Sequence, residues 1–471
     1  MNIYNSIMII YFVGMLLIGF ITSKQAAKST EEFMIAGHSL GLIPSIGTMT
    51  ATLFHAVNFI GWTGWLYVNG WSSNWHIGGS ILSMLILVAL AGRFRKVKFT
   101  TVPDYIRAKY DEKAEVLSAV LYIIDSLIAI IVQTLGMAVV VNVFLGIPLA
   151  ISIWFSVIIV GIYTVMGGFL AVAYTDVVQI GIAIVGFILA VVLSLSNVGG
   201  FTQMNLEIAK IDQKLIDAFA LGTLSIGSII GFQVLWGLTN IVQGQVFIRI
   251  SAPKTTKIAR IAVLSAAIMW YFTYIYGNPI LGLSARIMYP GIAKPDMVFP
   301  TLVKMTLPPI ASALVLCGIV AAVMSTCDSI LLFVASVFVK NIVLRTKKLE
   351  DKQAIFLSRI TIIALALLAG LGAQTYPSTI QWINIYRQTL IGSSITIPLL
   401  LGALWNPVPE SGFWSMIVGA VTGVTWWHTG WKVFSGLHPI IVGLCSALIL
   451  MIIWKLVAAN KGKLQESEMR L

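Results

Sequence analysis

The stretch that decides the fold runs from Gly318 to Leu332 and reads Gly-Ile-Val-Ala-Ala-Val-Met-Ser-Thr-Cys-Asp-Ser-Ile-Leu-Leu. It places hydroxyl groups and one carboxylate, that of Asp328, inside a segment otherwise apolar enough to cross a bilayer. An ionisable side chain in a span costs at least about 2.5 kcal/mol on insertion scales and is by default a candidate functional group. The stretch therefore predicts a membrane-spanning helix that carries a cation site.

The composition excludes a soluble globular domain, because 58% of the 471 residues are hydrophobic, 10% are charged and the mean hydropathy is +0.94. Apolar runs of about 20 residues, enough to cross about 30 Å of hydrocarbon, recur along the chain. We predict an all-α integral membrane protein with one transmembrane domain over residues 1–471. About thirteen spans are expected, near residues 4–23, 42–66, 74–92, 114–143, 148–166, 169–196, 220–247, 259–283, 309–340, 354–373, 380–402, 412–428 and 437–457.

The basic residues concentrate in alternate loops, which sets the expected orientation. The rich loops contain Lys24 and Lys28, Arg93–Lys113, Arg249–Arg260, Lys340–Lys352 and the carboxyl-terminal tail. Since loops rich in Lys and Arg stay in the cytoplasm, we expect a multi-pass plasma-membrane protein with its amino terminus outside and its carboxyl terminus inside. The same loops account for the net charge of +12 without a nucleic-acid partner.

Two expected spans carry interruptions typical of unwound transmembrane helices. The second contains Gly47, Asn58, Gly61 and Gly64, and the seventh contains Gly227, Gly231, Gly237, Gln233, Thr239 and Asn240. Spans two and seven are five apart, which fits two inverted five-helix halves, near 42–196 and 220–402, with the binding site where the broken helices meet. The alternative is that the glycines only let helices pack closely.

The ninth span offers the sharpest candidate site. Ala322, Ser325, Thr326 and Ser329 recur at intervals of three and four residues and so share one helix face. Hydroxyl and carbonyl oxygens are what a hard monovalent cation needs in exchange for water. The alternative is that these hydroxyls only bond to the preceding turn. Asp328 favours a site.

Two further acids, Asp125 and Asp176, and one base, Arg387, lie in expected spans. Together with Asp328, these make three acids and one base. If all four are ionised, two negative charges are uncompensated, and bound cations or protons would neutralise them. Two alternatives stay open: Arg387 pairs with an acid for structure alone, or Asp176 is wetted at the cytoplasmic end of its span.

No Gly-rich phosphate loop of the kind found in ATP-hydrolysing enzymes occurs in the sequence. We therefore expect a transporter coupled to an ion gradient and no enzyme activity. His55, next to the polar break of the second span, could relay protons near neutral pH or serve only in packing.

A set of motifs spread over most of the chain resembles the sodium:solute symporter family. They are Glu32–Gly37, Thr50-Ala-Thr with Phe59-Ile-Gly61, Val102–Tyr110, Gly167–Gln179 and Ala321–Ser329. The resemblance implies a five-plus-five inverted repeat of the leucine-transporter type. One extra helix would precede the repeat, near 4–23, and two would follow it, near 412–428 and 437–457.

The resemblance also implies cation sites. The main sodium site would use the backbone carbonyls of Ala51, Phe54 and Ala322 with the hydroxyls of Ser325 and Thr326. Some members have a second sodium site, which here would involve Ser325, Asp176, Asp328 and Ser329. Because Asp328 stands where those members have a hydroxyl, this position could hold a second cation or a proton.

The solute is expected near the two broken helices. The candidate contacts are Asn58, Trp62, Trp236, Asn240 and Arg387. A sugar is disfavoured, because the family's sugar transporters have a glutamine at the Asn58 position and an acid at the Val57 position. An arginine facing the cavity would suit a carboxylate, so we expect a small organic anion or zwitterion of the carboxylate, amino acid or vitamin type.

The expected function is import of this solute together with sodium by alternating access. The partners would be the solute, the sodium ion and the lipid bilayer, with no obligatory protein partner. Two alternatives stay open: a proton-coupled transporter that uses Asp176, Asp328 and His55, and a transporter-like sensor.

Overall fold

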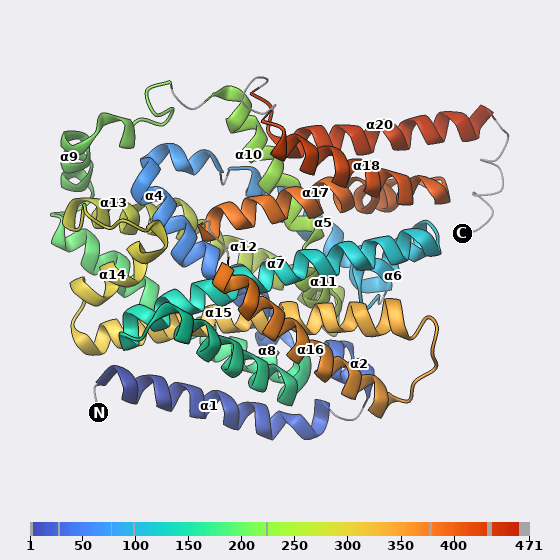
Figure 1. Cartoon of the computed structure of the whole chain (residues 1–471), viewed down its shortest axis with the longest axis horizontal. Coiled ribbons are helices and arrows are strands. Elements are labelled where there is room, and N and C mark those ends of the chain that lie inside the picture. The colour runs from blue at the N-terminus through green and yellow to red at the C-terminus, as the bar shows by residue number, and fades with distance from the viewer. Residues whose placement is uncertain are drawn as a thin grey trace.

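The computed structural model describes residues 3–26, 29–76, 78–97, 99–222, 225–375, 379–430 and 436–460. Lys28, Lys98 and the basic residues after 460, all used in the charge argument, lie outside the described residues. The described chain is helical, and its one β pairing is an isolated bridge between Leu40 and Pro253. α1 begins at one end of the bundle and α20 terminates at the opposite end (Figure 1), as an odd number of crossings requires.

The helices follow the expected spans. Their bounds are α1 Ile3–Ala26, α2 Thr30–Ile35, α3 Leu42–Leu53, η2 Val57–Trp62, α4 Thr63–Asn69, α5 Gly78–Val97, α6 Val102–Lys109, α7 Glu112–Leu145, α8 Leu149–Asn197, α9 Phe201–Ile211, α10 Ile226–Thr239, η5 Asn240–Val242, α11 Gly244–Ser251, α12 Thr256–Phe272, η6 Thr273–Gly277, α13 Asn278–Met288, η7 Pro295–Met297, α14 Val298–Thr306, α15 Pro309–Val337, η8 Phe338–Val343, α16 Asp351–Thr375, α17 Ile380–Leu404, α18 Pro409–His428 and α20 Pro439–Asn460.

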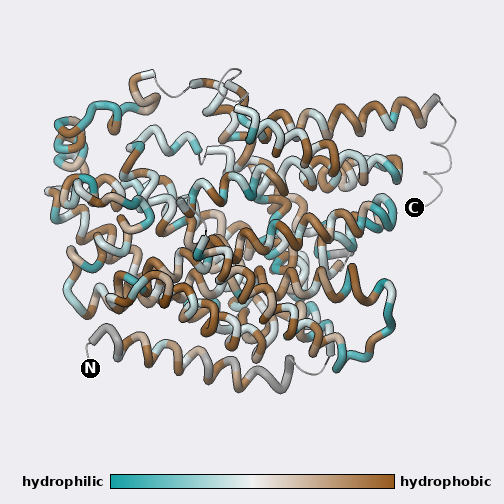
Figure 2. The backbone as a smooth tube through the Cα atoms, viewed as in Figure 1, coloured by the Kyte–Doolittle hydropathy of each residue, from teal (hydrophilic) through white to brown (hydrophobic). Residues whose placement is uncertain are grey.

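Length and apolar composition qualify eight of the described helical segments as spans, or nine if the bent pair α10–α11 counts as one. The other expected spans are broken, as in α3–α4, or less apolar along their length. Figure 2 shows hydrophilic stretches gathered at two opposite ends of the bundle and apolar residues between them. The whole chain is therefore built to sit across a bilayer.

α15 is the central helix of the bundle. Every residue from Val315 to Val337 is buried, as expected for a helix that is apolar on nearly all sides. It packs against α8, α7, α1 and α3. The polar stretch quoted above therefore lies in the interior of the protein and away from lipid.

Two spans are interrupted close to where sequence predicts. α3 ends at Leu53, Phe54 and His55 are non-helical, and the chain resumes as the π-helix η2 and then α4. The seventh span breaks at η5, between α10 and α11, with a bend of 47°. Local π-helix and unwound backbone are common at functional sites. A third interruption, at Gly168 with φ 57°, divides α8 into the two spans expected there.

The seventh span differs from the prediction at its end. It was expected to stop near residue 247, but α11 continues to Ser251 and encloses Arg249. Arg249 is 1% exposed, so it is wrong to count it among the loop charges. The helix can continue past Arg249 because the buried guanidinium is hydrogen-bonded inside the protein, as described next.

Candidate functional site

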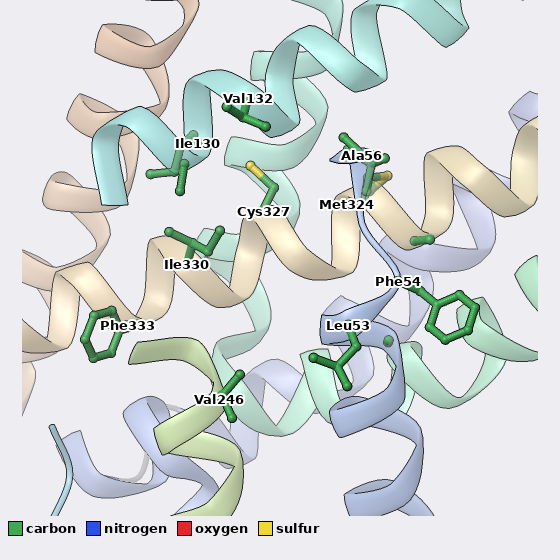
Figure 3. Packing of buried hydrophobic residues seen from close by; sticks show 14 of the residues in the cluster. Leu53, Phe54, Ala56, Ile130, Val132, Val246, Met324, Cys327, Ile330 and Phe333 are labelled. Atoms are coloured by element: carbon green, nitrogen blue, oxygen red, sulfur yellow. The ribbon is translucent and has the colours of Figure 1, made fainter. Parts of the chain in front are cut away.

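The first part of the site lies where the broken α3–η2 segment passes α15. Phe54 is extended, with φ −99° and ψ 92°, and helical conformation resumes at Ala56. The N–H of Ala56 donates to Gln133 Oε1 of α7 at 3.0 Å. Figure 3 shows this stretch running alongside α15, with Ala56 next to Met324. The break is therefore held from two neighbouring helices.

Carbonyl and hydroxyl oxygens converge at this crossing. Thr326 Oγ1 lies 3.4 Å from the Ala51 carbonyl oxygen and 3.3 Å from that of Ala322. Ser325 Oγ lies 3.3 Å from the same Ala322 oxygen. All four residues are buried, and Phe54 follows at the end of α3. The structure thus brings together Ala51, Ala322, Ser325 and Thr326 of the predicted main site. Neutral oxygens shielded from water are the ligands that sodium takes, and sodium binding at this point stays a prediction.

A second polar cluster lies one turn further along α15. We call it the charged cluster, and it consists of Thr48, Asp176, Arg249, Asp328 and Ser329. Arg249 Nη2 lies 3.1 Å from Asp176 Oδ2, and Arg249 Nε lies 2.8 Å from both the carbonyl oxygen and the hydroxyl of Thr48. Asp176 is fully buried, so the alternative of a wetted Asp176 is wrong.

Asp328 completes the charged cluster through a shared hydroxyl. Ser329 Oγ lies within hydrogen-bond distance of Arg249 Nη2, of the Ser325 carbonyl oxygen and, at 3.1 Å, of Asp328 Oδ1. Among the described residues, Asp328 has no ion pair of its own, and neither its Oδ2 nor Asp176 Oδ1 has a hydrogen-bond partner. The predicted second site therefore holds two carboxylates and, unexpectedly, one guanidinium.

Arg387 on α17 forms an ion pair. Its Nη1 lies 3.0 and 3.1 Å from the two carboxylate oxygens of Asp125 on α7, and its Nε and Nη2 lie near Asn384 Oδ1. Both charged groups are buried. This geometry matches the alternative in which Arg387 pairs with an acid, and contact with a solute stays a prediction.

Asn58 and Trp62 lie on η2, and each offers an unused donor. Asn58 Oδ1 accepts from Asn278 Nδ2 at 2.8 Å, but Asn58 Nδ2 has no partner among the described residues. Trp62 is 1% exposed, and its Nε1 likewise has no partner within that part of the chain. Buried donors are normally bonded, so these two are candidates for contact with the solute, and that contact stays a prediction.

The predicted contacts of the seventh span belong to a different network. Asn240 Nδ2 donates to Ser83 Oγ and to the Trp236 carbonyl, and Gln243 Nε2 donates to Asn240 Oδ1 at 2.8 Å. Trp236 packs at the edge of an apolar cluster between α10, α17 and α20. α17 contacts both η2 and η5, so it connects the interruptions of the two broken spans.

Sequence reasoning missed Arg249, Gln133 and Asn278, which bond Asp176, Ala56 and Asn58 respectively. Gln133 lies in an apolar run and Asn278 beside Pro279, with no motif to mark them. Arg249 had a usable signal. It follows an apolar stretch by only a few residues, and the surplus of intramembrane acids called for another base.

The chain is similar to known transporters over most of its length. The model of the sodium:solute symporter family matches residues 33–419. The chain is 28% identical to an osmoregulated proline transporter of Bacillus subtilis, over 96% of this chain and 94% of that one. It is also 28% identical to a sodium/pantothenate symporter of Haemophilus influenzae, over 90% and 89%.

Among solved structures, a Na+-coupled sialic acid symporter in a substrate-bound outward-open state superimposes with a TM-score of 0.84. The match has 20% identity and covers 96% of this chain and 97% of the other. This likeness establishes the leucine-transporter type of fold. With a family model that matches most of its length, the chain belongs to the sodium:solute symporter family.

Proposed function

We propose that this chain is a transporter that imports a small organic anion or zwitterion together with sodium, by alternating access, and that it is not an enzyme. The observation that carries the proposal is the convergence of the Ala51 and Ala322 carbonyls with the Ser325 and Thr326 hydroxyls at the break after α3. Sodium bound there would tie the unwound segment to α15 and favour one orientation of the bundle.

The solute class rests on two independent arguments. Proline, pantothenate and sialic acid, which name the similar transporters, all carry a carboxylate. In this chain, Asn58 Nδ2 and Trp62 Nε1 are buried donors without an acceptor, and a carboxylate is an acceptor with two oxygens. We infer that the solute's carboxylate lies against η2. Trp236, Asn240 and Arg387 would line the cavity further away.

The proposed orientation places the amino terminus outside and the carboxyl terminus in the cytoplasm of the plasma membrane. The basic loops around Arg93–Lys113 and Lys340–Lys352 support it, because they lie with α2 and α6 at the end where α20 terminates. The inverted-repeat halves near 42–196 and 220–402 would then cross the membrane in opposite senses. Labelling of cysteines introduced at Gln213 and Lys348 from either side of sealed vesicles tests this orientation.

The first experiment is a thermal-unfolding screen of the purified protein against carboxylates, amino acids, vitamins and sugars, in sodium and in potassium. A ligand that binds only the folded state raises its stability by mass action. A carboxylate that stabilises in sodium and not in potassium is the expected result. If neither sodium nor any compound shifts the transition, the proposal fails.

A variant separates the solute site from the sodium site. Asn58→Asp replaces the free donor by a carboxylate of the same size, which should abolish the shift by an organic anion and leave the shift by sodium alone. Asn197→Asp, at the exposed end of α8, is the matched control. Binding of the anion to Asn58→Asp with unchanged affinity would contradict the assignment to η2.

A further inference from the structure

We infer that Arg249 is a built-in second cation, so that this transporter binds one sodium ion per cycle, with Asp328 as the counter-charge of that ion. The inference rests on the proposed sodium coupling and specifies its stoichiometry. It begins from the charges enclosed beside the main site. Asp176, Asp328 and Arg249 are all at most 1% exposed, and Arg249–Asp176 is their one ion pair within the described chain.

The guanidinium occupies the position that a second sodium ion would need. Such an ion would take the Asp176 carboxylate and the Ser329 hydroxyl as ligands. Asp176 Oδ2 instead lies 3.1 Å from Arg249 Nη2, and Ser329 Oγ bonds to the same nitrogen. Arg249 Nε and Nη1 are bonded to Thr48 and to the Gln245 carbonyl, so the guanidinium is anchored on three sides.

The anchoring also makes the position selective for a guanidinium. The fixed planar donors of Arg249 reach a carboxylate, two hydroxyls and two carbonyls at once, an arrangement that matches a guanidinium and not a spherical ion. Arginine stays protonated in proteins, so the charge is permanent. The ligands predicted for a second sodium are thus already used, and a second sodium does not fit beside them.

The charge balance then assigns a role to Asp328. Arg249 neutralises Asp176, and one negative charge remains on Asp328, whose Oδ2 has no partner among the described residues. The main sodium site is built from neutral oxygens and lies on the same helix, at Ser325 and Thr326. One bound sodium makes the buried region neutral, and a second would leave an uncompensated positive charge there.

The experiment measures equilibrium binding of radioactive sodium to purified protein, which counts ions without requiring transport. Wild type and Arg249→Lys should bind one ion per chain. Arg249→Gln, which leaves two uncompensated carboxylates, should bind two. Asp328→Asn should lose at least about tenfold in sodium affinity, because a unit charge nearby in protein is worth more than about 1.4 kcal/mol.

The double variant Arg249→Gln/Asp328→Asn restores the wild-type charge and should again bind one ion, with an affinity closer to wild type than Asp328→Asn shows. Arg286→Gln is the matched control, since Arg286 is a half-buried arginine that lies over the Tyr67 ring and not on an acid. Its stoichiometry should stay at one.

Two ions bound by wild type would overturn the inference, as would one ion bound by Arg249→Gln with unchanged affinity. If Arg249→Gln does not fold, Asp328→Asn and the double variant decide, because the inference fails when their sodium affinities are equal. Failure of the proposed function looks different: wild type then binds no sodium and shows no sodium-dependent solute shift.

Discussion

The hydroxyls of Ser325 and Thr326 lie further from the carbonyl oxygen of the preceding turn than an ordinary back-bonded hydroxyl does. Both lie 3.3 Å from the Ala322 carbonyl oxygen, longer than the usual 2.7–2.8 Å of a hydroxyl bond. Ser336, further along the same helix, shows the usual geometry of a back-bonded hydroxyl, with its Oγ 2.7 Å from the Leu332 carbonyl oxygen. The back-bonding alternative therefore describes Ser336 well and leaves Ser325 and Thr326 free to turn toward an ion.

Removal of both hydroxyls should weaken sodium binding. In Ser325→Ala/Thr326→Ala the site keeps only backbone oxygens, so we expect the half-saturating sodium concentration to rise at least about tenfold, which corresponds to 1.4 kcal/mol. Sodium titration of the thermal transition measures it. Ser336→Ala is the control on the same helix. Sodium dependence that stays the same in the double variant would remove the main-site assignment.

The buried Asp125–Arg387 pair should stabilise the protein only while both partners are present, because a single buried charge without its partner is costly. Loss of one partner typically costs about 3–5 kcal/mol. We expect Asp125→Asn to lower the thermal transition by many degrees even without ligand. Glu207→Gln, which removes the carboxylate of the surface pair Glu207–Lys210, should change it little. A stable Asp125→Asn that has lost only solute binding would instead make Arg387 a solute contact.

The break between α3 and η2 depends on its neighbour α7. Ala56 donates its N–H to Gln133, and a Cβ on Gly136 would lie 2.3 Å from Ala56 Cβ. Only glycine allows this approach. The break is thus specified by two elements far apart in sequence, which is why its exact form did not follow from the second span alone.

Gly136→Ala should therefore displace the broken segment. We expect a sodium affinity lower by about fivefold or more, and a destabilisation of about 1–3 kcal/mol from overpacking. Gly181→Ala, on α8, has no atom within 4 Å of the added methyl and should be neutral or slightly stabilising. The two thermal transitions, each titrated with sodium, give the comparison. Equal sodium affinities would mean that α7 does not position the break.

The start of α17 is bonded by an ionisable side chain, that of Asp296. Asp296 Oδ2 accepts the Ile380 N–H at 3.1 Å, and the residue borders cavities of about 870 and 220 Å³. Burial raises the pKa of the Asp296 carboxyl to about 6, against the opposing effect of the Ile380 hydrogen bond. Between its unfolded value near 4 and this value, the folded state binds the extra proton.

Stability should consequently fall as pH rises from about 4 to about 6, because the folded protein loses a proton that the unfolded chain has already released. In Asp296→Asn this contribution is absent. The difference in melting temperature, wild type minus variant, should therefore decrease across this range and stay constant above about pH 7. A difference that does not depend on pH would exclude titration of Asp296.

Sequence alone predicted the spans, the two interruptions and the oxygen-rich face of α15, because each depends on composition or helical period within one segment. It did not predict Arg249 inside α11, the support of Ala56 by Gln133, or the pairing of Asn58 with Asn278. Each of these joins residues from different helices. From sequence alone, a charged residue near the end of a span is assigned to the adjoining loop, because its buried partner on another helix is not known.

The whole molecule has a clasp at the end proposed to face the cytoplasm. We define the clasp as His38, Leu40, Arg95 and Ser251–Lys254. The Leu40 N–H donates to the Ala252 carbonyl and the Lys254 N–H to the Leu40 carbonyl. His38 Nδ1 lies 2.6 Å from the Ser251 carbonyl oxygen. Arg95 bonds the carbonyls of His38, Pro253 and Lys254. The clasp thus ties the entry to α3 to the exit from α11.

This connection matters for alternating access because α3 and α11 each belong to a broken span. A cavity of about 600 Å³ lined by Leu40, Leu170 and Lys254 lies beside the clasp. Opening toward this side requires α3 and α11 either to separate or to move as one body. Arg95 is buried, and its hydrogen bonds described above all go to backbone carbonyls of the clasp. It therefore holds the clasp closed and takes no part in the proposed main sodium site or in the charged cluster.

Loss of Arg95 should therefore shift the protein toward the state open on this side. We expect Arg95→Gln to raise the rate of maleimide labelling at Leu170→Cys by about fivefold or more, which corresponds to about 1 kcal/mol in the opening equilibrium. The background carries Cys445→Ser, because Cys445 is the exposed cysteine of the described residues. Arg93→Gln, an exposed position on the same helix, is the control. Sodium should slow labelling in both, since it stabilises the opposite state. If Arg95→Gln labels at the wild-type rate, α3 and α11 move together and the clasp is a permanent joint.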